Sequence, residues 1–315
     1  MISMNSPSLC VCIITYQRPK GLRRLLDALV PQIQGRTGRS VVVVNDGSHD
    51  NSYSEVIDKY SAFVHYHQLE QNCGVARARN EAVLQTDSDY VVFIDDDCLP
   101  PPFWLDWLAA ELEEFPELDV VAGVTRPLFP DNPGFFAKVQ AELGFFPNPE
   151  RLHDLIRCVT ANLAIRRKFF WELGGFRHYD NFPGAAEDTE ISSRISRSDC
   201  FRRIDWEWYV FHDVGDGLVK NMKRYWRYGF ANVCLHHYTI SPPYQDGVLD
   251  LIRAPHLPYF RGIFKYRFKL AKKAFPSTIQ CLLAALFTSL IDMAYRAGCR
   301  DAARQIQERS QTSAG

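Results

Sequence analysis

The sequence predicts an α/β protein with a mostly parallel sheet flanked by helices and a C-terminal helical appendage. Short apolar runs rich in β-branched residues alternate with segments whose apolar residues recur every three or four positions. This alternation is typical of a parallel sheet covered by helices. With 315 residues, of which 46% are hydrophobic, the chain can also bury a sizeable core.

The first half contains the expected strands and the helices that connect them. Residues 19–33 and 75–85 place apolar side chains on one side of a helix, and Pro100 to Pro102 favour a helix start before Trp104. The expected strands are residues 9–15, 40–46, 63–68, 90–95 and 119–124.

Beyond Thr125 the pattern is less regular, because prolines at positions 127, 130, 133, 147 and 149 interrupt any long element. Regular structure is expected to resume further along the chain. The expected elements are a strand over 157–166, a helix from Lys168, a turn at 174–176, a helix over 187–198, a strand near Tyr209 and a helix over 219–235.

Charge and cysteine content narrow the class of protein. The formal net charge is −1, from 36 basic and 37 acidic residues, so no global field draws the chain to nucleic acid, and we expect no nucleic-acid partner. The nine cysteines show no paired spacing, and no secretory signal opens the sequence. We therefore expect a cytoplasmic protein with reduced thiols.

The C-terminal region leaves two alternatives open. Residues 279–291 form an apolar run that is shorter than the roughly 18 to 20 residues of a membrane span. Basic residues precede it, namely Lys265, Arg267, Lys269, Lys272 and Lys273. A helical hairpin packed on the domain is the favoured interpretation. The alternative is a pair of amphipathic helices in peripheral contact with the inner face of the membrane.

Polar clusters follow the expected strands where each one ends. These clusters are 15–18 (Thr-Tyr-Gln-Arg), 45–48 (Asn-Asp-Gly-Ser) and 95–97 (Asp-Asp-Asp). Ligands of open parallel sheets bind outside the carboxyl ends of the strands, so these residues are the first candidates for a binding site.

The acidic run at Asp95, Asp96 and Asp97 suggests a metal and nucleotide site. While the chain stays extended, Asp95 and Asp97 share one side and Asp96 faces the other. Adjacent carboxylates repel each other unless a cation joins them, and magnesium or manganese bridging diphosphate oxygens would do so. Helix capping is the alternative, but it needs one acid rather than three.

A second cluster lies at residues 72–80, where small residues and two arginines begin a helix. Such a helix start suits nucleotide phosphates or a base. The alternative is an exposed basic helix face, which stays open for Arg79.

These segments together resemble glycosyltransferase family 2 with the GT-A fold, over about residues 9–229. The matching pieces are residues 13–18, 43–48, 72–80, 93–97 with a DxD motif, Gly174-Gly175-Phe176 and Glu187-Asp188. The resemblance rests on their order and spacing.

The resemblance implies a role for each matching residue. Thr15, Tyr16 and Arg18 would border the nucleotide pocket, Asp46 would meet the base and Arg77 would hold the donor. In the acidic run, Asp95 would contact the ribose side, Asp96 would support it and Asp97 would bind the metal. The family's acidic pair falls on Glu187 and Asp188, so the role of catalytic base comes to Asp188.

Chemistry supports the assignment of Asp188, because an acceptor oxygen must lose its proton as it displaces a diphosphate with inversion. The alternative is that Glu187 and Asp188 only favour a helix N-terminus. His212 follows an apolar run and is a candidate metal ligand, although a lone histidine there is more often structural.

The expected protein is an inverting, metal-dependent hexosyltransferase that moves one sugar from a UDP-, dTDP- or GDP-sugar to an acceptor hydroxyl. The acceptor would be a glycan, a lipid-linked saccharide or a natural product. The expected divisions are 1–8 (polar leader), 9–125 (nucleotide-sugar-binding half), 126–235 (acceptor-side and catalytic half) and 236–315 (helical extension). The alternatives are a nucleotidyltransferase and a non-catalytic nucleotide-sugar-binding or scaffold protein.

Overall fold

The computed structural model describes residues 6–49, 52–129, 134–143, 158–178, 186–214, 217–238 and 256–312. Most of the predicted leader and the start of the strand predicted at 157 lie outside these residues. The chain divides into two compact units. The first contains the described residues up to 128, then 158–178 and 187–213, and the second contains the other described residues, chiefly those from 214 on.

The first unit is built on an eight-stranded sheet in the order β3-β2-β1-β4-β7-β6-β8-β5. Its strands are β1 (Leu9–Thr15), β2 (Arg39–Asn45), β3 (Val64–Gln68), β4 (Tyr90–Asp95), β5 (Cys98–Leu99), β6 (Val120–Leu128), β7 (Leu163–Arg166) and β8 (Arg202–Asp213). Neighbours among β3, β2, β1 and β4 pair in parallel. β7 runs antiparallel between β4 and β6, and β5 runs antiparallel to β8. The mostly parallel α/β fold predicted from the sequence is confirmed.

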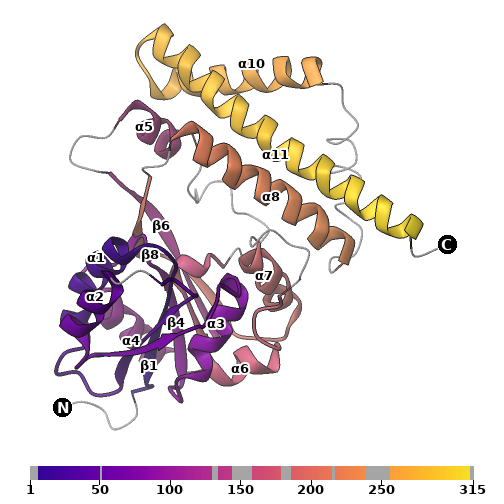
Figure 1. Ribbon diagram of the computed structural model, residues 1–315. Coiled ribbons are helices and arrows are strands. Elements are labelled where there is room, and N and C mark those ends of the chain that lie inside the picture. The colour runs from indigo at the N-terminus through magenta and orange to yellow at the C-terminus, as the bar shows by residue number, and fades with distance from the viewer. Residues whose placement is uncertain are drawn as a thin grey trace. The chain divides into compact units, whose positions relative to one another are not determined.

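Helices cover both faces of this sheet (Figure 1). They are α1 (Pro19–Leu29), α2 (Ser52–Tyr60), α3 (Val75–Leu84), α4 (Trp104–Glu114), α6 (Arg167–Glu172) and α7 (Glu187–Arg197). α1, α2 and α4 share one apolar core with the sheet, and α3, α6 and α7 share the other. Because both faces are buried, the central strands read as continuous apolar runs.

Two elements differ from the sequence prediction for local reasons. The helix expected over 19–33 ends at Leu29 and continues as a 3₁₀ turn, Val30–Gln32, which contains Pro31. Proline lacks the N–H that a helix needs at that point. The later strand begins only at Leu163, after the 3₁₀ turn Thr160–Asn162. There Asn162 donates to the carbonyls of Val124 and Trp208, which fixes the turn against the sheet.

The described part of the second unit contains α5 (Phe135–Glu142), α8 (Leu218–Tyr238), α10 (His256–Ala274) and α11 (Thr278–Thr312). α11 lies along α8 and also contacts α10 and α5, as Figure 1 shows. α11 is long and apolar enough over Thr278–Arg309 to cross a membrane by length and composition, and 44% of its most apolar window is buried.

Glycines let α8 and α11 cross closely. A Cβ at Gly229 would collide with the carbonyl of Tyr295, and one at Gly298 would collide with the carbonyl of Trp226. Polar contacts flank this crossing, since Trp226 Nε1 donates to Asp301 at 2.9 Å and Asn232 donates to the Tyr295 hydroxyl at 2.7 Å. The later turns of α11 are therefore held by α8.

Replacing Gly298 by alanine should destabilise the second unit by about 1–3 kcal/mol, because the added methyl has only backbone atoms in front of it. Gly262 in α10 is the matched control, since nothing lies within 4 Å of a Cβ built there. Gly262→Ala should raise stability by about 0.5–1 kcal/mol through helix propensity. Urea unfolding followed by circular dichroism checks both, and equal effects of the two changes would contradict the close crossing.

Candidate active site

The candidate site lies at the carboxyl ends of β1, β2 and β4. Thr15 is the register partner of Asn45, and Ile14 is the partner of Asp95, so the three strands end at one edge of the sheet. The sequence places polar residues directly after each of these strands. This is the edge at which open α/β sheets bind their ligands.

The acidic run changes direction where β4 ends. Asp95 is the last strand residue and accepts a hydrogen bond from Arg79, on the α3 side of the sheet. Asp96 and Asp97 instead share a partner, because Arg18 Nη1 contacts both carboxylates. Asp97 therefore does not lie on the side of Asp95, where a chain that stayed extended would have placed it. The strand ends at Asp95 and the chain turns, so the alternation of an extended chain stops there.

Asp96 belongs to a buried hydrogen-bond chain. The Thr15 hydroxyl donates to Asp96 at 2.8 Å and lies 2.9 Å from the Tyr53 hydroxyl, which accepts from the Arg18 N–H at 2.7 Å. Burial raises the pKa of Asp96 to about 7, the adjacent Asp97 adds to the shift, and Arg18 opposes it. Asp96 thus links the end of β4 to β1 and, through Thr15, to α2.

Asp97, Cys98 and His212 form a cluster in which one ligand atom from each lies within 4.8 Å of the others. Pairing of β5 with β8 creates the cluster, since Cys98 is the register partner of His212. His212 Nε2 lies 3.4 Å from an Asp97 oxygen. Cys98 is fully buried, and burial raises the pKa of its thiol well above the usual value. A protonated thiol is a poor ligand, which leaves Asp97 and His212 as the useful pair.

The donor atoms of this pair fit a divalent cation. His212 Nδ1 lies 3.0 Å from the Asp213 carbonyl, which can only accept, so in the neutral imidazole Nδ1 carries the proton and the lone pair of Nε2 lies on the side of Asp97. Two ligands of one octahedral ion are separated by about 3 Å, close to the observed spacing. The lone pair of Nε2 and the Asp97 carboxylate would repel each other unless a cation lay between them or a proton were bound to Nε2.

Arg24 of α1 contacts both segments that carry the Asp97–His212 pair. It donates to both oxygens of Asp213, at 2.9 and 2.8 Å, and to the Asp97 carbonyl at 3.3 Å. The Asp213 N–H also donates to the Asp97 carbonyl at 3.1 Å. The loop after β4 is thus fixed to the end of β8, which holds Asp97 and His212 near each other.

Arg79 connects two parts of the site that the sequence separates widely. Its guanidinium, which is buried, donates to Asp95 at 2.7 Å and to Glu187. The exposed-face alternative for Arg79 is therefore wrong, because α3 presents this side chain to β4 and α7. Arg77, two positions earlier, is the exposed arginine of this helix start.

Asp46 shapes the loop that leads into α3. Its carboxylate accepts from the N–H of Cys73 at 2.7 Å and from that of Gly74 at 3.1 Å. Gly47 adopts φ +78°, and a side chain there would collide with the backbone of Gln71 and Asn72. The turn after β2 and the segment before α3 are therefore pressed together, which places Asp46 beside the start of α3.

Asp188 lies in the first turn of α7, directly after Glu187. Its Oδ1 accepts from the Thr189 N–H at 2.6 Å. Ala186, just before the helix, adopts φ 70°, which a residue with a side chain rarely takes. Of the loop that leads into this helix, Gly184 and Ala185 lie outside the described residues.

Tyr16, which the sequence places at the nucleotide pocket, is exposed directly after the end of β1.

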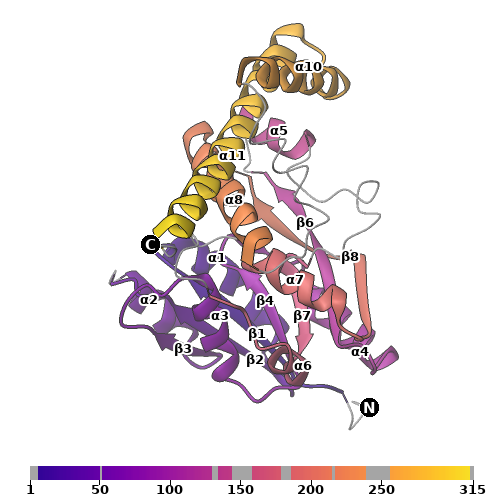
Figure 2. The ribbon, with the colours of Figure 1, turned by 90° about the vertical axis from the view of Figure 1, so that its right-hand side faces the viewer.

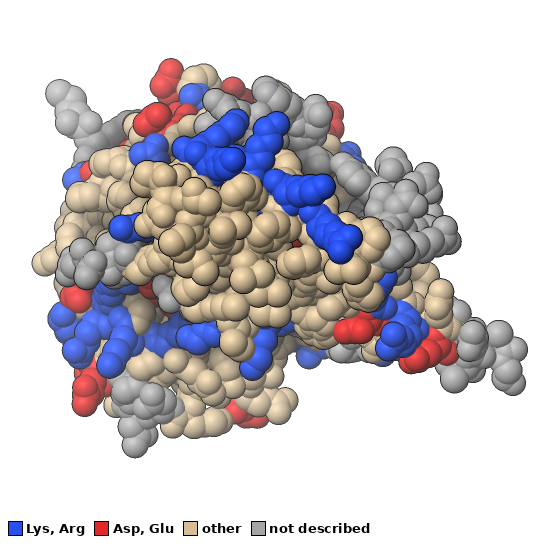
Figure 3. Space-filling view, turned by 90° about the horizontal axis from the view of Figure 1, so that it is seen from above, with Lys and Arg blue, Asp and Glu red and all other residues tan. Residues whose placement is uncertain are grey.

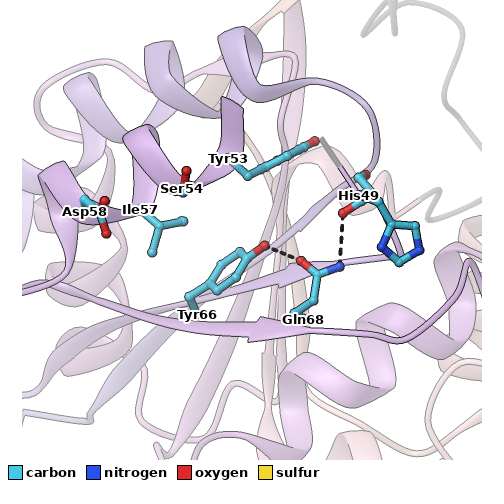
Figure 4. A pocket seen from close by; sticks show the side chains of 8 residues that line it. His49, Tyr53, Ser54, Ile57, Asp58, Tyr66 and Gln68 are labelled. Carbon is cyan, nitrogen blue, oxygen red and sulfur yellow. Dashed lines mark hydrogen bonds between the residues drawn. The ribbon is translucent and has the colours of Figure 1, made fainter. Parts of the chain in front are cut away.

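A hollow of about 440 Å³ lies beside the site (Figure 4). It is lined by Ser48 and His49 in the loop after β2, by α2 and by β3, with Tyr53, Tyr66 and Gln68 among its residues. Gln68 donates to the Ser48 carbonyl at 3.1 Å, one of the contacts drawn in Figure 4. Of the polar clusters predicted from the sequence, only Ser48 at the end of the 45–48 cluster lines this hollow.

Sequence reasoning missed three residues of the site. Tyr53 was missed because the helix α2 was not predicted, although Tyr53, Val56 and Tyr60 have helical spacing and are all buried. Arg24 and Cys98 have no local signal, since each acts through a strand or helix distant in the sequence.

Solved structures share this fold. The mannosyltransferase PcManGT from Pyrobaculum calidifontis, in complex with GDP-Man and Mn²⁺, superimposes with a TM-score of 0.60 at 17% identity, over 93% of this chain and 88% of that chain. S. aureus TarS 1–349 in complex with UDP-GlcNAc gives 0.54 at 17% identity, over 95% and 92%. The sheet and its flanking helices therefore define a GT-A fold.

Sequence relatives give the family. Residues 10–174 match the family model "Glycosyl transferase family 2", and the chain belongs to this family. It is 25% identical to glycosyltransferase AglE of Haloferax volcanii over 178 residues, which are 55% of this chain and 57% of AglE. The chain spans less than two thirds of the length of the first curated relatives that it matches.

Proposed function

We propose that the protein is an inverting, metal-assisted glycosyltransferase that moves one sugar from a nucleotide-diphosphate sugar to an acceptor hydroxyl. The observation that carries the proposal is the pairing of Asp97 with the Nε2 of His212 at 3.4 Å, beside an acidic strand end in a family 2 chain. Solved structures of the same fold hold GDP-Man with Mn²⁺ and UDP-GlcNAc. The bases of these two bound nucleotides differ, so UDP-, dTDP- and GDP-sugars all remain candidate donors.

In this proposal each residue has one task. Thr15, Tyr16 and Arg18 border the nucleotide, Asp46 meets the base and Arg77 helps to hold the donor. Asp95 meets the ribose, with Asp96 fixing the turn through Thr15. Asp97 and His212 would hold a manganese or magnesium ion, which would supply positive charge to stabilise the leaving diphosphate.

Asp188 acts as the general base. Its carboxylate takes the proton of the acceptor hydroxyl as the oxygen attacks the anomeric carbon from the side opposite the diphosphate. The carbon–oxygen bond to the diphosphate breaks in the same displacement, which inverts the anomeric centre. The acceptor is a glycan, a lipid-linked saccharide or a natural product.

The test is a calorimetric titration with UDP, dTDP, GDP and CDP, each with manganese and with EDTA. One nucleotide should bind, and EDTA should weaken its binding at least about tenfold. Asp97→Asn should weaken the manganese-dependent part by about 10–100-fold, since a metal ligand is lost. Asp87→Asn, whose side chain is 99% exposed, is the control and should bind as the wild type does.

Two results would contradict the proposal. If neither EDTA nor Asp97→Asn changes nucleotide binding, the metal has no part in the mechanism. If none of the four nucleotides binds, the donor site itself is wrong, and a scaffold role becomes the better interpretation.

A further inference from the structure

The second unit carries a basic stripe and an apolar stripe on one helical hairpin. α10, residues 256–274, contains six basic residues and no acidic residue, and residues 274–291 carry no charge at all. A short turn joins α10 to α11, and the two helices pack against each other. Arg267 fixes them by donating to both oxygens of Asp292, at 2.8 Å each.

The basic stripe runs along one side of α10. Its exposed members are Arg261, Lys265, Lys269 and Lys272, at intervals of four, four and three residues, together with Lys273. These intervals place side chains on the same face of a helix. Arg267 lies outside the stripe, because it is turned toward Asp292 and is only 19% exposed.

The apolar stripe lies on the first turns of α11. Ile279, Leu282, Leu283 and Leu286 are 70%, 44%, 48% and 42% exposed, and their spacing again defines one helix face. Phe136 of α5, which is 43% exposed, stacks on Phe287 at 4.6 Å and extends the apolar area. Figure 3 shows Lys and Arg side chains gathered along the border of a broad uncharged area on this face.

We propose that α10 and the first turns of α11 form a docking surface for an anionic lipid bilayer. The leucines and Ile279 enter the interface between headgroups and acyl chains, and the lysines of α10 meet the anionic headgroups. Charge favours this occupant, since the stripe is purely basic while the whole chain has a formal net charge of −1.

The surface lies on the bilayer and does not cross it. The exposed stripe from Ile279 to Leu286 is about 12 Å long at 1.5 Å per residue, against a hydrocarbon core of about 30 Å. Beyond it, α11 contains Asp292, which is held by Arg267, and Gly298, which lies against α8. These later turns of α11 pack against other helices of the protein, so they do not contact the bilayer. The proposal does not depend on the catalytic one, because vesicle binding needs no turnover.

Vesicle co-sedimentation of the full chain tests the proposal. Vesicles of phosphatidylcholine alone are compared with vesicles that contain about one third phosphatidylglycerol. The wild type should bind the anionic vesicles at least tenfold more tightly, and added salt should weaken this binding. Changing Lys265, Lys269, Lys272 and Lys273 to glutamine together should weaken it by more than about fiftyfold, since each lysine near the surface contributes about fivefold.

A matched pair of leucine variants separates docking from general charge effects. Leu283→Asp should weaken binding at least tenfold. Leu84→Asp, at a 59% exposed leucine of α3, should bind as the wild type does. Circular dichroism of both variants confirms that the helices remain folded.

Three results would overturn the proposal. The first is equal binding of neutral and anionic vesicles, or no binding of either. The second is wild-type binding by the lysine or Leu283 variants. The third is resistance of vesicle-bound protein to extraction with alkaline carbonate, which would indicate a helix that spans the bilayer.

Discussion

Replacing Asp188 by asparagine is expected to lower sugar transfer by about 10²–10⁴-fold and to leave donor binding within about twofold of the wild type. The amide has nearly the same shape, and its oxygen can still accept from the Thr189 N–H as Oδ1 does now. What the variant loses is the capacity to take a proton from the acceptor. The change should therefore lower kcat and leave the affinity for the nucleotide sugar unchanged.

The measurement is release of nucleoside diphosphate from the donor that the titration identifies, with water or a supplied acceptor taking the sugar. Asp199→Asn is the control, because Asp199 is an exposed residue just after α7. A transfer rate within about threefold of the wild type in Asp188→Asn would rule out this residue as the base. Loss of donor binding together with transfer would instead indicate a positioning role.

The central strands could be predicted from the sequence because their signals are local. Leu9–Thr15 and Tyr90–Asp95 were predicted with the bounds that the structure shows. Each is an apolar run that ends in a polar residue, and burial on both faces makes such runs unambiguous. The polar strand ends that define the candidate site could be read in the same way.

The order of the strands could not be predicted, because it depends on pairing between distant segments. β7 has four residues and inserts antiparallel between β4 and β6. The two-residue β5 pairs with β8 across more than a hundred positions, and this pairing alone brings Cys98 beside His212. Neither strand is long enough to show a period.

Arg77 and Arg79 show why side-chain roles are harder to predict than strands. The sequence gives two arginines two positions apart at a helix start, where either could face a ligand. In the structure Arg79 turns inward to Asp95 and Glu187, while Arg77 is exposed. The acids that decide between them lie on β4 and α7, so only the folded sheet distinguishes the two residues.

Replacing Arg79 by methionine should destabilise the first unit by about 2–4 kcal/mol, because it leaves Asp95 and Glu187 facing each other without their cation. The estimate is below that for a fully buried pair, since the Asp95 side chain is 34% exposed. Arg77→Met is the matched control on the same helix. It should change stability by less than about 0.5 kcal/mol and, if Arg77 holds the donor, should weaken nucleotide-sugar binding.

Urea unfolding, combined with nucleotide titration, distinguishes these two arginines. Adding Glu187→Gln to Arg79→Met should restore part of the lost stability, because one of the uncompensated charges is removed. If the single and the double variant lose the same free energy of unfolding, the ion pair with Glu187 is not what Arg79 contributes to stability. Since Glu187 precedes Asp188 in the first turn of α7, the same bridge orients the proposed base. Arg79→Met should therefore also lower transfer, and the double variant should regain stability without regaining transfer, because neutral side chains no longer tie α7 to β4.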